Sequence, residues 1–279
     1  MTADTRHADA EIENARSIAY GLIASVLSYP DSESLHALAD SLCGCRAGEL
    51  LKRAFPALAG RFEAISKALA RLANIESNEA ATVQNVYTEL FGHAVRGTCP
   101  LYELEYRHSD ILQQASELAD ISGFYQAFGM ELVRESHERA DHVTVQCEFM
   151  SVLAAKQAYA LETSNDEARQ VLHDAQRSFL TDHMSKWLPA FCSRVQQADP
   201  DGFYGEVAAF LGELNKAESN RFGVAYGPEY LELRPADMQR DTAFQCGIEE
   251  SCPGSTPGST PASTTGGPEP LVQLGIDRK

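Results

Sequence analysis

Basic residues are scarce in this 279-residue chain. Only 23 Lys and Arg stand against 40 Asp and Glu, which gives a formal net charge of −17. A protein that binds nucleic acid by neutralising phosphates needs the opposite excess, so that class is excluded. The strong negative charge instead suits a partner that carries Arg or Lys.

Long apolar runs are also absent. No run approaches the roughly 18 residues of a membrane-spanning helix. The polar start MTADTRHADAEIEN lacks the basic and apolar regions of a secretory signal. We therefore expect a cytoplasmic protein. With 44% hydrophobic residues the chain can still build a sizeable core, which excludes disorder along its whole length.

Cysteines in metal-binding pairs are missing as well. The seven Cys are an odd number, and neither Cys43 with Cys45 nor Cys246 with Cys252 has the C-x2-C spacing of a structural zinc site. In a chain too long to need disulfides, this pattern favours reduced thiols. We expect neither a metal site nor another cofactor.

Enzyme motifs are not found. The sequence has no P-loop, no G-x-G-x-x-G, no G-x-S-x-G and no H-E-x-x-H. One catalytic alternative stays open, because helical proteins can hold two irons between two E-x-x-H pairs and two further Glu. Glu33 with His36, and Glu105 with His108, have that spacing. Such matches also arise by chance in so acidic a chain, so we favour a protein that is not an enzyme.

Helical periodicity dominates the chain. Apolar residues recur at spacings of three and four, and the β-branched runs typical of strands are almost absent. The residues that mark helix ends are Pro30, Gly44, Gly92 and Gly129. The expected helices cover about 12–29, 31–44, 57–73, 78–91, 108–119, 120–129, 141–154, 166–197, which Pro189 can interrupt, and 203–216. The sequence thus predicts an all-α helical bundle of about nine to eleven helices.

Composition changes sharply near residue 245. Seventeen of the twenty residues 251–270 are Pro, Ser, Thr or Gly, and GSTP occurs twice in succession. Such a segment has too little apolar surface to offset the entropy lost on ordering. We therefore expect one helical domain over residues 1–245, with a hinge near 132–141, and a flexible tail over 246–279.

Two stretches concentrate residues suited to binding a peptide. The first combines a helix face with the loop after it and holds Tyr87, Leu90, Phe91, Tyr102, Glu103, Glu105 and Tyr106. Aromatic side chains with one polar end typically line peptide grooves, and the glutamates place carboxylates beside them. The alternative is a core helix corner with solvent-exposed glutamates.

The second stretch runs from Glu138 to His142, at a junction between a loop and a helix. Asp141 precedes a strongly helical segment, so the simplest interpretation is an N-cap that accepts backbone N–H groups, with Glu138 exposed. The alternative is that Glu138 and Asp141 receive arginines of a partner. His142 would then hold Asp141 by a hydrogen bond and tune the site near neutral pH.

The order of these motifs resembles the TorD/DmsD/NarJ family of chaperones for molybdenum-containing oxidoreductases. The likeness covers about residues 10–215. It rests on Y-x-x-L-F-G from Tyr87, P-x-Y-E from Pro100, L-A-D-I-S-G-F-Y-Q-A-F-G from Leu118 and E-R-A-D-H from Glu138. The segment Y-E-L-E-Y from Tyr102 and the A-D-I-S-G-F-Y run are most similar to the branch that serves type II dimethyl sulfoxide reductase-family enzymes.

The resemblance implies an all-helical cytoplasmic chaperone that binds the cofactor-free catalytic subunit and often its twin-arginine signal peptide. The E-x-P-D-H motif implicated in that recognition is matched here by Glu138, Asp141 and His142. Ala140 replaces the usual proline, which gives a less rigid loop. The helix implicated in signal-peptide contact is matched by Tyr87, Leu90 and Phe91.

We therefore expect binding rather than catalysis. The aromatic and apolar residues of the first stretch would bury the apolar part of a leader peptide. The carboxylates of Glu103, Glu138 and Asp141 would receive its arginines. The nitrate-reductase branch of the family suggests a rival, in which the chain grips the folded body of its client and ignores the leader. The choice between a monomer and a domain-swapped homodimer stays open.

Overall fold

The structure is a computed structural model that describes residues 3–42, 47–72, 79–92, 96–107, 111–132 and 138–235. Within these ranges the chain forms helices and no strand, and extended backbone pairs only at two isolated bridges, Gly92 with Arg96 and Tyr102 with His142. The expected all-α fold is confirmed. The expected tail, residues 246–279, and the centre of the expected hinge, residues 133–137, lie outside the described residues.

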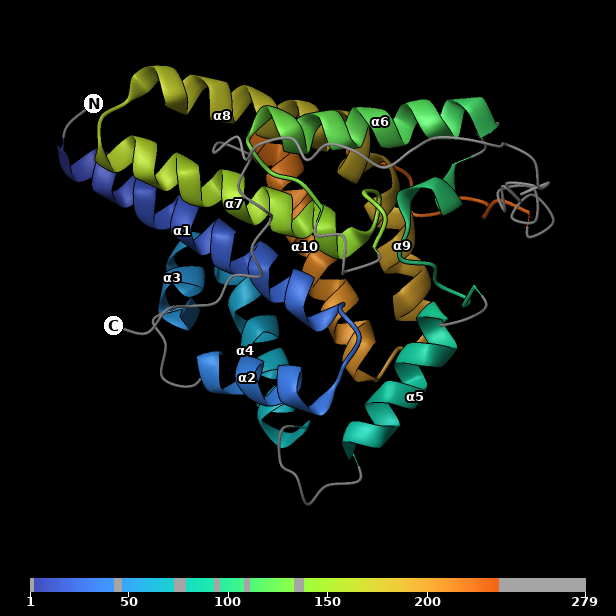
Figure 1. Ribbon diagram of the computed structural model, residues 1–279. Helices are drawn as coiled ribbons and strands as arrows, with labels where there is room; N and C mark the ends of the chain where they lie inside the picture. The colour runs from blue at the N-terminus through green and yellow to red at the C-terminus, as the bar shows by residue number, and fades with distance from the viewer. Residues whose placement is uncertain are drawn as a thin grey trace, which may run out of the picture.

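Figure 1 shows the described helical elements in chain order. They are α1 (Ala3–Val26), α2 (Ser32–Leu42), α3 (Ala47–Ala54), α4 (Pro56–Leu72), α5 (Glu79–Phe91), the 3-10 turn η1 (Glu103–Tyr106), α6 (Ile111–Ala127), α7 (Val143–Glu162), α8 (Asp166–Phe179), the π-helical segment η3 (Leu180–Met184), α9 (Ser185–Ala198) and α10 (Phe203–Phe222).

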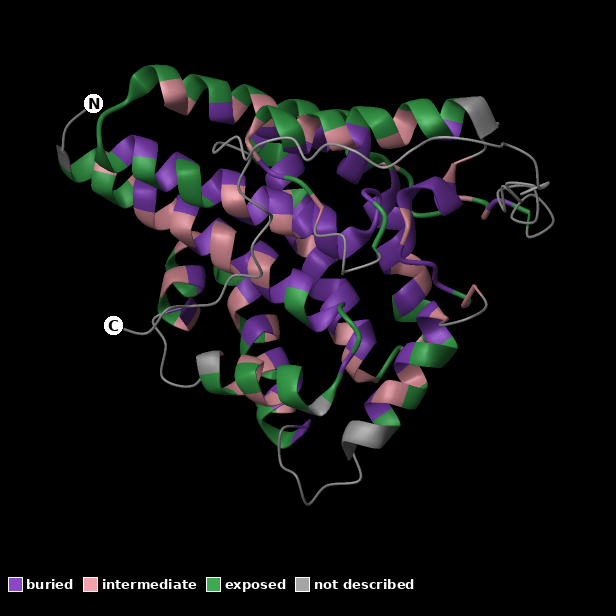
Figure 2. Ribbon diagram, viewed as in Figure 1, coloured by how far each residue is buried: buried purple, intermediate pink, exposed green. Residues whose placement is uncertain are grey.

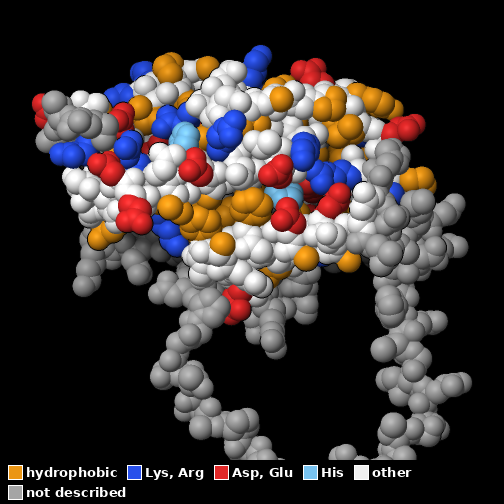
Figure 3. Space-filling view, turned by 90° about the horizontal axis from the view of Figure 1, so that it is seen from above, with side chains coloured by type: hydrophobic (Ala, Val, Ile, Leu, Met, Phe, Trp, Pro, Cys, Tyr) orange, Lys and Arg blue, Asp and Glu red, His pale blue; other side chains and the backbone are white. Residues whose placement is uncertain are grey.

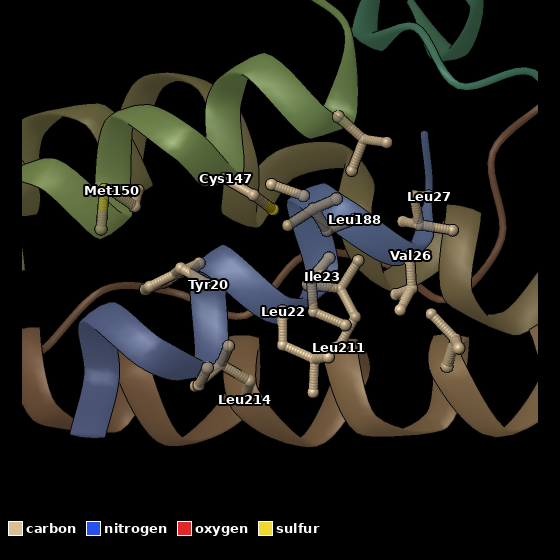
Figure 4. Close-up of a cluster of buried hydrophobic side chains, with 14 of the residues drawn as sticks. Tyr20, Leu22, Ile23, Val26, Leu27, Cys147, Met150, Leu188, Leu211 and Leu214 are labelled. Carbon is tan, nitrogen blue, oxygen red and sulfur yellow. The ribbon is translucent and has the colours of Figure 1, made fainter. Parts of the chain in front are cut away.

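Long helices packed side by side form the centre of the molecule. α1 lies along α7, and α10 packs against α9 and α4 (Figure 1). Small residues let α1 and α7 approach closely: a Cβ on Gly21 would lie 3.4 Å from Ser151 Oγ, which donates to the carbonyl of Ser17 at 2.8 Å. Apolar side chains fill the space between these helices (Figure 4). The outer helices α6 and α8 expose one face and bury the other (Figure 2).

A buried ion cluster joins the first helix to the last. The Arg16 guanidinium on α1 donates through Nε to the two oxygens of Glu218 on α10, at 2.8 and 3.0 Å, and also pairs with Glu13. Tyr20 donates to the same Glu218 carboxylate at 3.2 Å. All four side chains are almost fully buried. Because breaking a buried pair leaves an uncompensated charge, this cluster fixes how the two helices meet.

The expected and observed helices differ in several places. The eight-residue α3 was not predicted, because it offers only Ala47 and Leu51 as fully buried positions, too few to show a helical period. The expected helices 108–119 and 120–129 form the single helix α6. Gly129 follows its end with φ +74°, as expected for a residue that terminates a helix.

The expected helix 166–197 is interrupted at the π segment η3, not at Pro189, which lies inside α9. Proline lacks the N–H that would bond the carbonyl four residues earlier, that of Ser185. In the structure that carbonyl accepts the N–H of Gly227 at 3.0 Å instead. The helix therefore continues through Pro189, because a segment from elsewhere supplies the missing donor.

Gly227 belongs to an extended segment, residues 224–235, which we call the C-terminal strap. The strap follows α10, runs along α9, where Arg194 donates to the carbonyl of Leu231 at 3.2 Å, and ends beside η1. There the N–H of Arg234 donates to the carbonyl of Glu105 at 2.9 Å, and Arg96 donates to both the Glu105 carboxylate and the Arg234 carbonyl, at 2.8 and 2.6 Å. The strap is thus part of the folded unit.

Three of the seven cysteines lie in the described residues. Cys99, Cys147 and Cys192 are buried and form no disulfide. The remaining four, Cys43, Cys45, Cys246 and Cys252, lie outside the described residues.

Candidate functional site

Two backbone segments are paired where the two predicted motifs meet. The segment before η1 bonds to the segment before α7: the N–H of Glu103 donates to the carbonyl of Asp141 at 3.0 Å, and that of Val143 to Leu101 at 2.8 Å. From α6, the Tyr125 hydroxyl donates to the carbonyl of Ala140 at 2.7 Å. The backbone that carries Asp141 is therefore held from two sides.

Asp141 does not cap α7. Its carboxylate turns toward η1 and accepts the N–H of Leu104 at 3.1 Å, while His142 is the N-cap, its Nδ1 accepting the N–H of Thr144 at 3.3 Å. The N-cap interpretation of Asp141 is wrong, because the paired backbone aims its side chain at the 3-10 turn. Asp141 is fully buried, and burial raises the pKa of its carboxyl while Arg139 opposes that rise.

Arg139 binds the other side of this carboxylate. Its Nε donates to Oδ1 at 3.0 Å and its NH2 to Oδ2 at 2.8 Å, which is bidentate pairing. The same guanidinium lies over the ring of Tyr102, 4.8 Å from the centroid. The Arg139 side chain is 42% exposed although that of Asp141 is 0% exposed. A guanidinium therefore covers the outward side of a buried carboxylate.

Glu138 borders the same place. The Tyr102 hydroxyl donates to its carboxylate at 3.1 Å, and partial burial raises the pKa of this carboxyl. The neighbouring His142 does not bond Asp141: Nδ1 faces the Thr144 hydroxyl at 2.6 Å, and Nε2 is 3.6 Å from Glu138. Burial lowers the pKa of His142 to about 3. The expected hydrogen bond from His142 to Asp141 is therefore wrong, and the lowered pKa does not favour a switch near neutral pH.

Glu103 is not available to a client. It is fully buried and accepts from Gln146 Nε2 at 2.6 Å, with His183 Nδ1 at 3.3 Å and Arg107 at 3.2 Å from its other oxygen. Gln146 in turn accepts from Trp187 Nε1 at 3.2 Å. The expectation that Glu103 receives a client arginine does not fit this structure, because groups of the chain itself surround it.

The expected aromatic groove is mostly core. Tyr87, Leu90, Phe91 and Tyr106 are each less than 9% exposed, and the rings of Tyr87 and Phe91 pack edge-on against Tyr204 at 5.8 and 5.1 Å. For these residues the structure favours the core interpretation. Their packing fixes α5 against α10 and so supports the surface beside them.

Tyr29, the last residue of the expected helix 12–29, follows the end of α1 at Val26. It is 48% exposed and meets Tyr87 edge-on at 5.5 Å. The pKa of Tyr87 is raised mainly by burial, and to a lesser extent by Glu138, Tyr102 and Tyr29. We define the Tyr102 surface as the partly exposed residues Tyr29, Tyr102, Glu138 and Arg139, with the carboxylate of Asp141 behind them.

Arg139 was also missed by the sequence analysis. Its position in the E-R-A-D-H stretch places it next to two acids, but no residue spacing states which of them it binds. The backbone turn decides that Arg139 binds Asp141. The N–H of His142 donates to the Arg139 carbonyl at 3.1 Å, and this turn brings the guanidinium back over Asp141.

Away from the Tyr102 surface, a cleft lies between α6 and η3. It is a polar cleft of about 490 Å³ lined by Arg107, Ser116, Glu117, Asp120, Asp182, His183 and Lys186. Seen from the side that carries α6 and α8, the surface mixes acidic, basic and hydrophobic side chains without a single-sign patch (Figure 3). The mixture of charges in the cleft favours no particular ligand.

Comparison with known proteins decides the family. The nitrate reductase delta subunit family matches residues 55–193. The perchlorate reductase assembly chaperone protein of Dechloromonas aromatica (strain RCB) is 32% identical over 186 residues, which are 65% of this chain and 78% of that protein. This chain belongs to the TorD/NarJ family of reductase assembly chaperones. Its relatives are chaperones rather than enzymes, as the resemblance implied.

Two further relatives support the family. The selenate reductase assembly chaperone protein of Thauera selenatis is 30% identical over 139 residues, 50% of this chain and 68% of that protein. A chaperone protein TorD of Vibrio cholerae is 28% identical over 144 residues, 51% of this chain and 62% of that protein. No solved structure matches this TorD/NarJ-family chain significantly.

The described residues do not support the di-iron alternative. No three His, Cys, Asp or Glu come together there as metal ligands. Of the proposed iron ligands, Glu105 pairs with Arg96, and His108 lies outside those ranges. No helix of the described chain has the length and apolar character needed to cross a membrane.

Proposed function

We propose that this TorD/NarJ-family chain is a cytoplasmic chaperone that binds the catalytic subunit of a molybdenum-containing oxidoreductase and holds it for cofactor insertion before export. Support comes from the family and from relatives named as assembly chaperones of perchlorate and selenate reductases. Holding a client requires binding energy and no bond chemistry. The relevant residues are therefore those that contact the client.

We infer that the contact includes the twin-arginine leader of the client and that it forms on the Tyr102 surface. The observation that carries this inference is the Asp141 carboxylate beside the Tyr102 ring, an arrangement that already binds a guanidinium at 2.8 and 3.0 Å. Glu138 adds a second carboxylate, and the exposed ring of Tyr29 offers an apolar face to the segment that follows the arginines. The net charge of −17 attracts a cationic peptide from a distance.

A synthetic leader peptide with Arg-Arg before an apolar segment tests this proposal by fluorescence anisotropy. Its affinity should fall as salt is raised, because exposed ion pairs are screened. Replacing Arg-Arg by Lys-Lys should weaken binding by about tenfold, because lysine cannot pair in the bidentate way. Equal affinity for both peptides at all salt concentrations would contradict leader recognition.

The rival mode needs a separate measurement. If the chain grips the folded body of its client, the catalytic subunit should bind equally well with and without its leader. If the leader is the contact, removing it should abolish most of the affinity. The same two forms of the catalytic subunit decide between these modes.

A further inference from the structure

Arg139 occupies the place that a client arginine would need. The Asp141 carboxylate has an inner side bound to the N–H of Leu104 and an outer side bound to Arg139. We propose that Arg139 is an internal competitor: its guanidinium fills an arginine-specific site in the unbound chaperone, and an arginine of the client displaces it. This inference rests on leader recognition at the Tyr102 surface.

The geometry is specific for a guanidinium. Two nitrogens of the guanidinium donate to the two oxygens of one carboxylate, and its Cζ lies 4.8 Å from the centroid of the Tyr102 ring. Bidentate pairing and stacking on a ring are both properties of arginine and not of lysine. The chain itself therefore shows which side chain this site accepts.

The contacts of the segment separate a fixed backbone from a movable side chain. The carbonyls of Arg139, Ala140 and Asp141 all accept hydrogen bonds, from His142, Tyr125 and Glu103 respectively. The Arg139 side chain, by contrast, is 42% exposed and has solvent beside it. It can swing outward without moving Asp141.

Because Asp141 is buried, we expect one guanidinium to replace another on its carboxylate. A fully buried carboxylate without a partner is strongly unfavourable, so the site is not left empty. A client arginine that enters as Arg139 leaves keeps the carboxylate paired throughout. The apparent affinity for the client then equals the intrinsic affinity multiplied by the fraction of molecules in which Arg139 has left Asp141.

The test compares Arg139→Ala with a matched control, Arg53→Ala. Arg53 on α3 also forms an ion pair, with Glu11 at 3.1 Å, and its side chain is 56% exposed. Both variants change the net charge by the same amount, so a gain due only to weaker repulsion of a cationic peptide appears in both. Each variant is titrated with the Arg-Arg and Lys-Lys leader peptides, and its melting temperature is followed with methylguanidinium and with methylammonium.

We expect Arg139→Ala to bind the Arg-Arg peptide about fivefold more tightly than the unaltered chain, with no such gain for Lys-Lys or for Arg53→Ala. Methylguanidinium should raise the melting temperature of Arg139→Ala alone, because it refills the site, and methylammonium should not. The inference is overturned if Arg139→Ala gains no more affinity for Arg-Arg than Arg53→Ala does, or if methylguanidinium affects both variants equally.

The two proposals fail in different ways. If the unaltered chain and Arg139→Ala both ignore the Arg-Arg peptide, leader recognition fails, even where methylguanidinium still stabilises Arg139→Ala. If the unaltered chain binds the peptide and Arg139→Ala binds it no better, leader recognition stands and the internal competitor fails. If Arg139→Ala does not fold, Arg139→Lys replaces it as the test variant, because lysine keeps the charge and loses the bidentate pairing. We expect Arg139→Lys to show a smaller gain in affinity for the Arg-Arg peptide.

Discussion

The N–H of Gly227 donates to the carbonyl of Ser185 at 3.0 Å, to which Pro189, four residues further on, cannot donate because it has no N–H. A Cβ at position 227 would lie 2.3 Å from that oxygen, so only glycine can come this close. The strap and α9 therefore depend on each other at one point: α9 provides the acceptor, and the strap provides a residue small enough to reach it.

Gly227→Ala should detach the strap from α9. We expect the free energy of unfolding to fall by about 1–3 kcal/mol, because a buried carbonyl loses its donor. Chemical denaturation and amide exchange of residues 224–235 measure this effect. Gly60→Ala is the control, because a Cβ there meets nothing within 4 Å in the middle of α4, and it should be neutral or stabilising. Equal effects of the two substitutions would contradict the role of Gly227.

Truncation should distinguish the strap from the tail. Removing residues 246–279 should leave the melting temperature and client binding unchanged, since their composition predicts a flexible segment. Removing residues 224–279 should lower the melting temperature by several degrees, because Glu105 loses Arg234 as a partner and α9 loses its donor. If the chain that ends at residue 245 is destabilised, the folded domain extends beyond residue 245 and the expected boundary is wrong.

Glu148 on α7 should make the protein less stable above pH 7 than near pH 4.5. Burial raises the pKa of its carboxyl to about 7, against an ordinary value of 4.5. Between pH 4.5 and 7 the native state thus binds a proton that the unfolded chain has released, so the free energy of unfolding falls as pH rises through this window. The pKa of His142 is lowered to about 3, so its contribution to the free energy of unfolding rises with pH between about pH 3 and 6.5.

Glu148→Gln isolates this effect. At pH 8 the variant should be more stable than the unaltered chain by roughly 1–3 kcal/mol, because it no longer buries a charge, and near pH 5 the two should be nearly equal. Urea denaturation at both pH values measures the difference, and at pH 8 His142 is neutral in both states. A stability difference that does not change with pH would contradict the assignment to Glu148.

Asp141→Asn should separate client binding from folding. Asn keeps an oxygen that accepts the N–H of Leu104, so we expect a change of only a few degrees in the melting temperature. It loses the charge and the bidentate pairing, so affinity for the Arg-Arg leader should fall by about tenfold or more. Asp141→Ala removes both functions and should also unfold more readily. Unchanged affinity in the Asn variant would move the arginine site to Glu138.

Helix positions could be predicted from the sequence because burial on one face imposes a period. The spacing of Leu58, Phe62, Ile65, Leu69 and Leu72 predicted α4 to within two residues, and all five are buried. The break at 180–184 could not be predicted, because Pro189 is the stronger local signal and its missing N–H is replaced by Gly227, which is 38 residues further along (227 − 189). Local patterns do not contain such distant partners.

The candidate site was predicted only in its location. Glu138, Asp141 and Tyr102 do come together, because two segments that are far apart in sequence pair through their backbones. Which side chains face solvent could not be predicted, since a glutamate such as Glu103 reads as exposed unless its buried partners Gln146 and His183 are known. Arg139 could not be predicted as the partner of Asp141, because its spacing does not distinguish Glu138 from Asp141.

The pairing of Arg16 with Glu218 has a consequence for synthesis on the ribosome. The two residues are 202 positions apart, and at about 5–20 residues per second their separation is roughly 10–40 s of translation. During that time α1 exists without α10, its guanidinium has only Glu13 nearby, and its apolar face has no complete core to enter. Nascent chains arrested before α10 should be cleaved readily along α1. A protein that we propose binds incompletely assembled enzymes thus itself has no complete core until α10 has been synthesised.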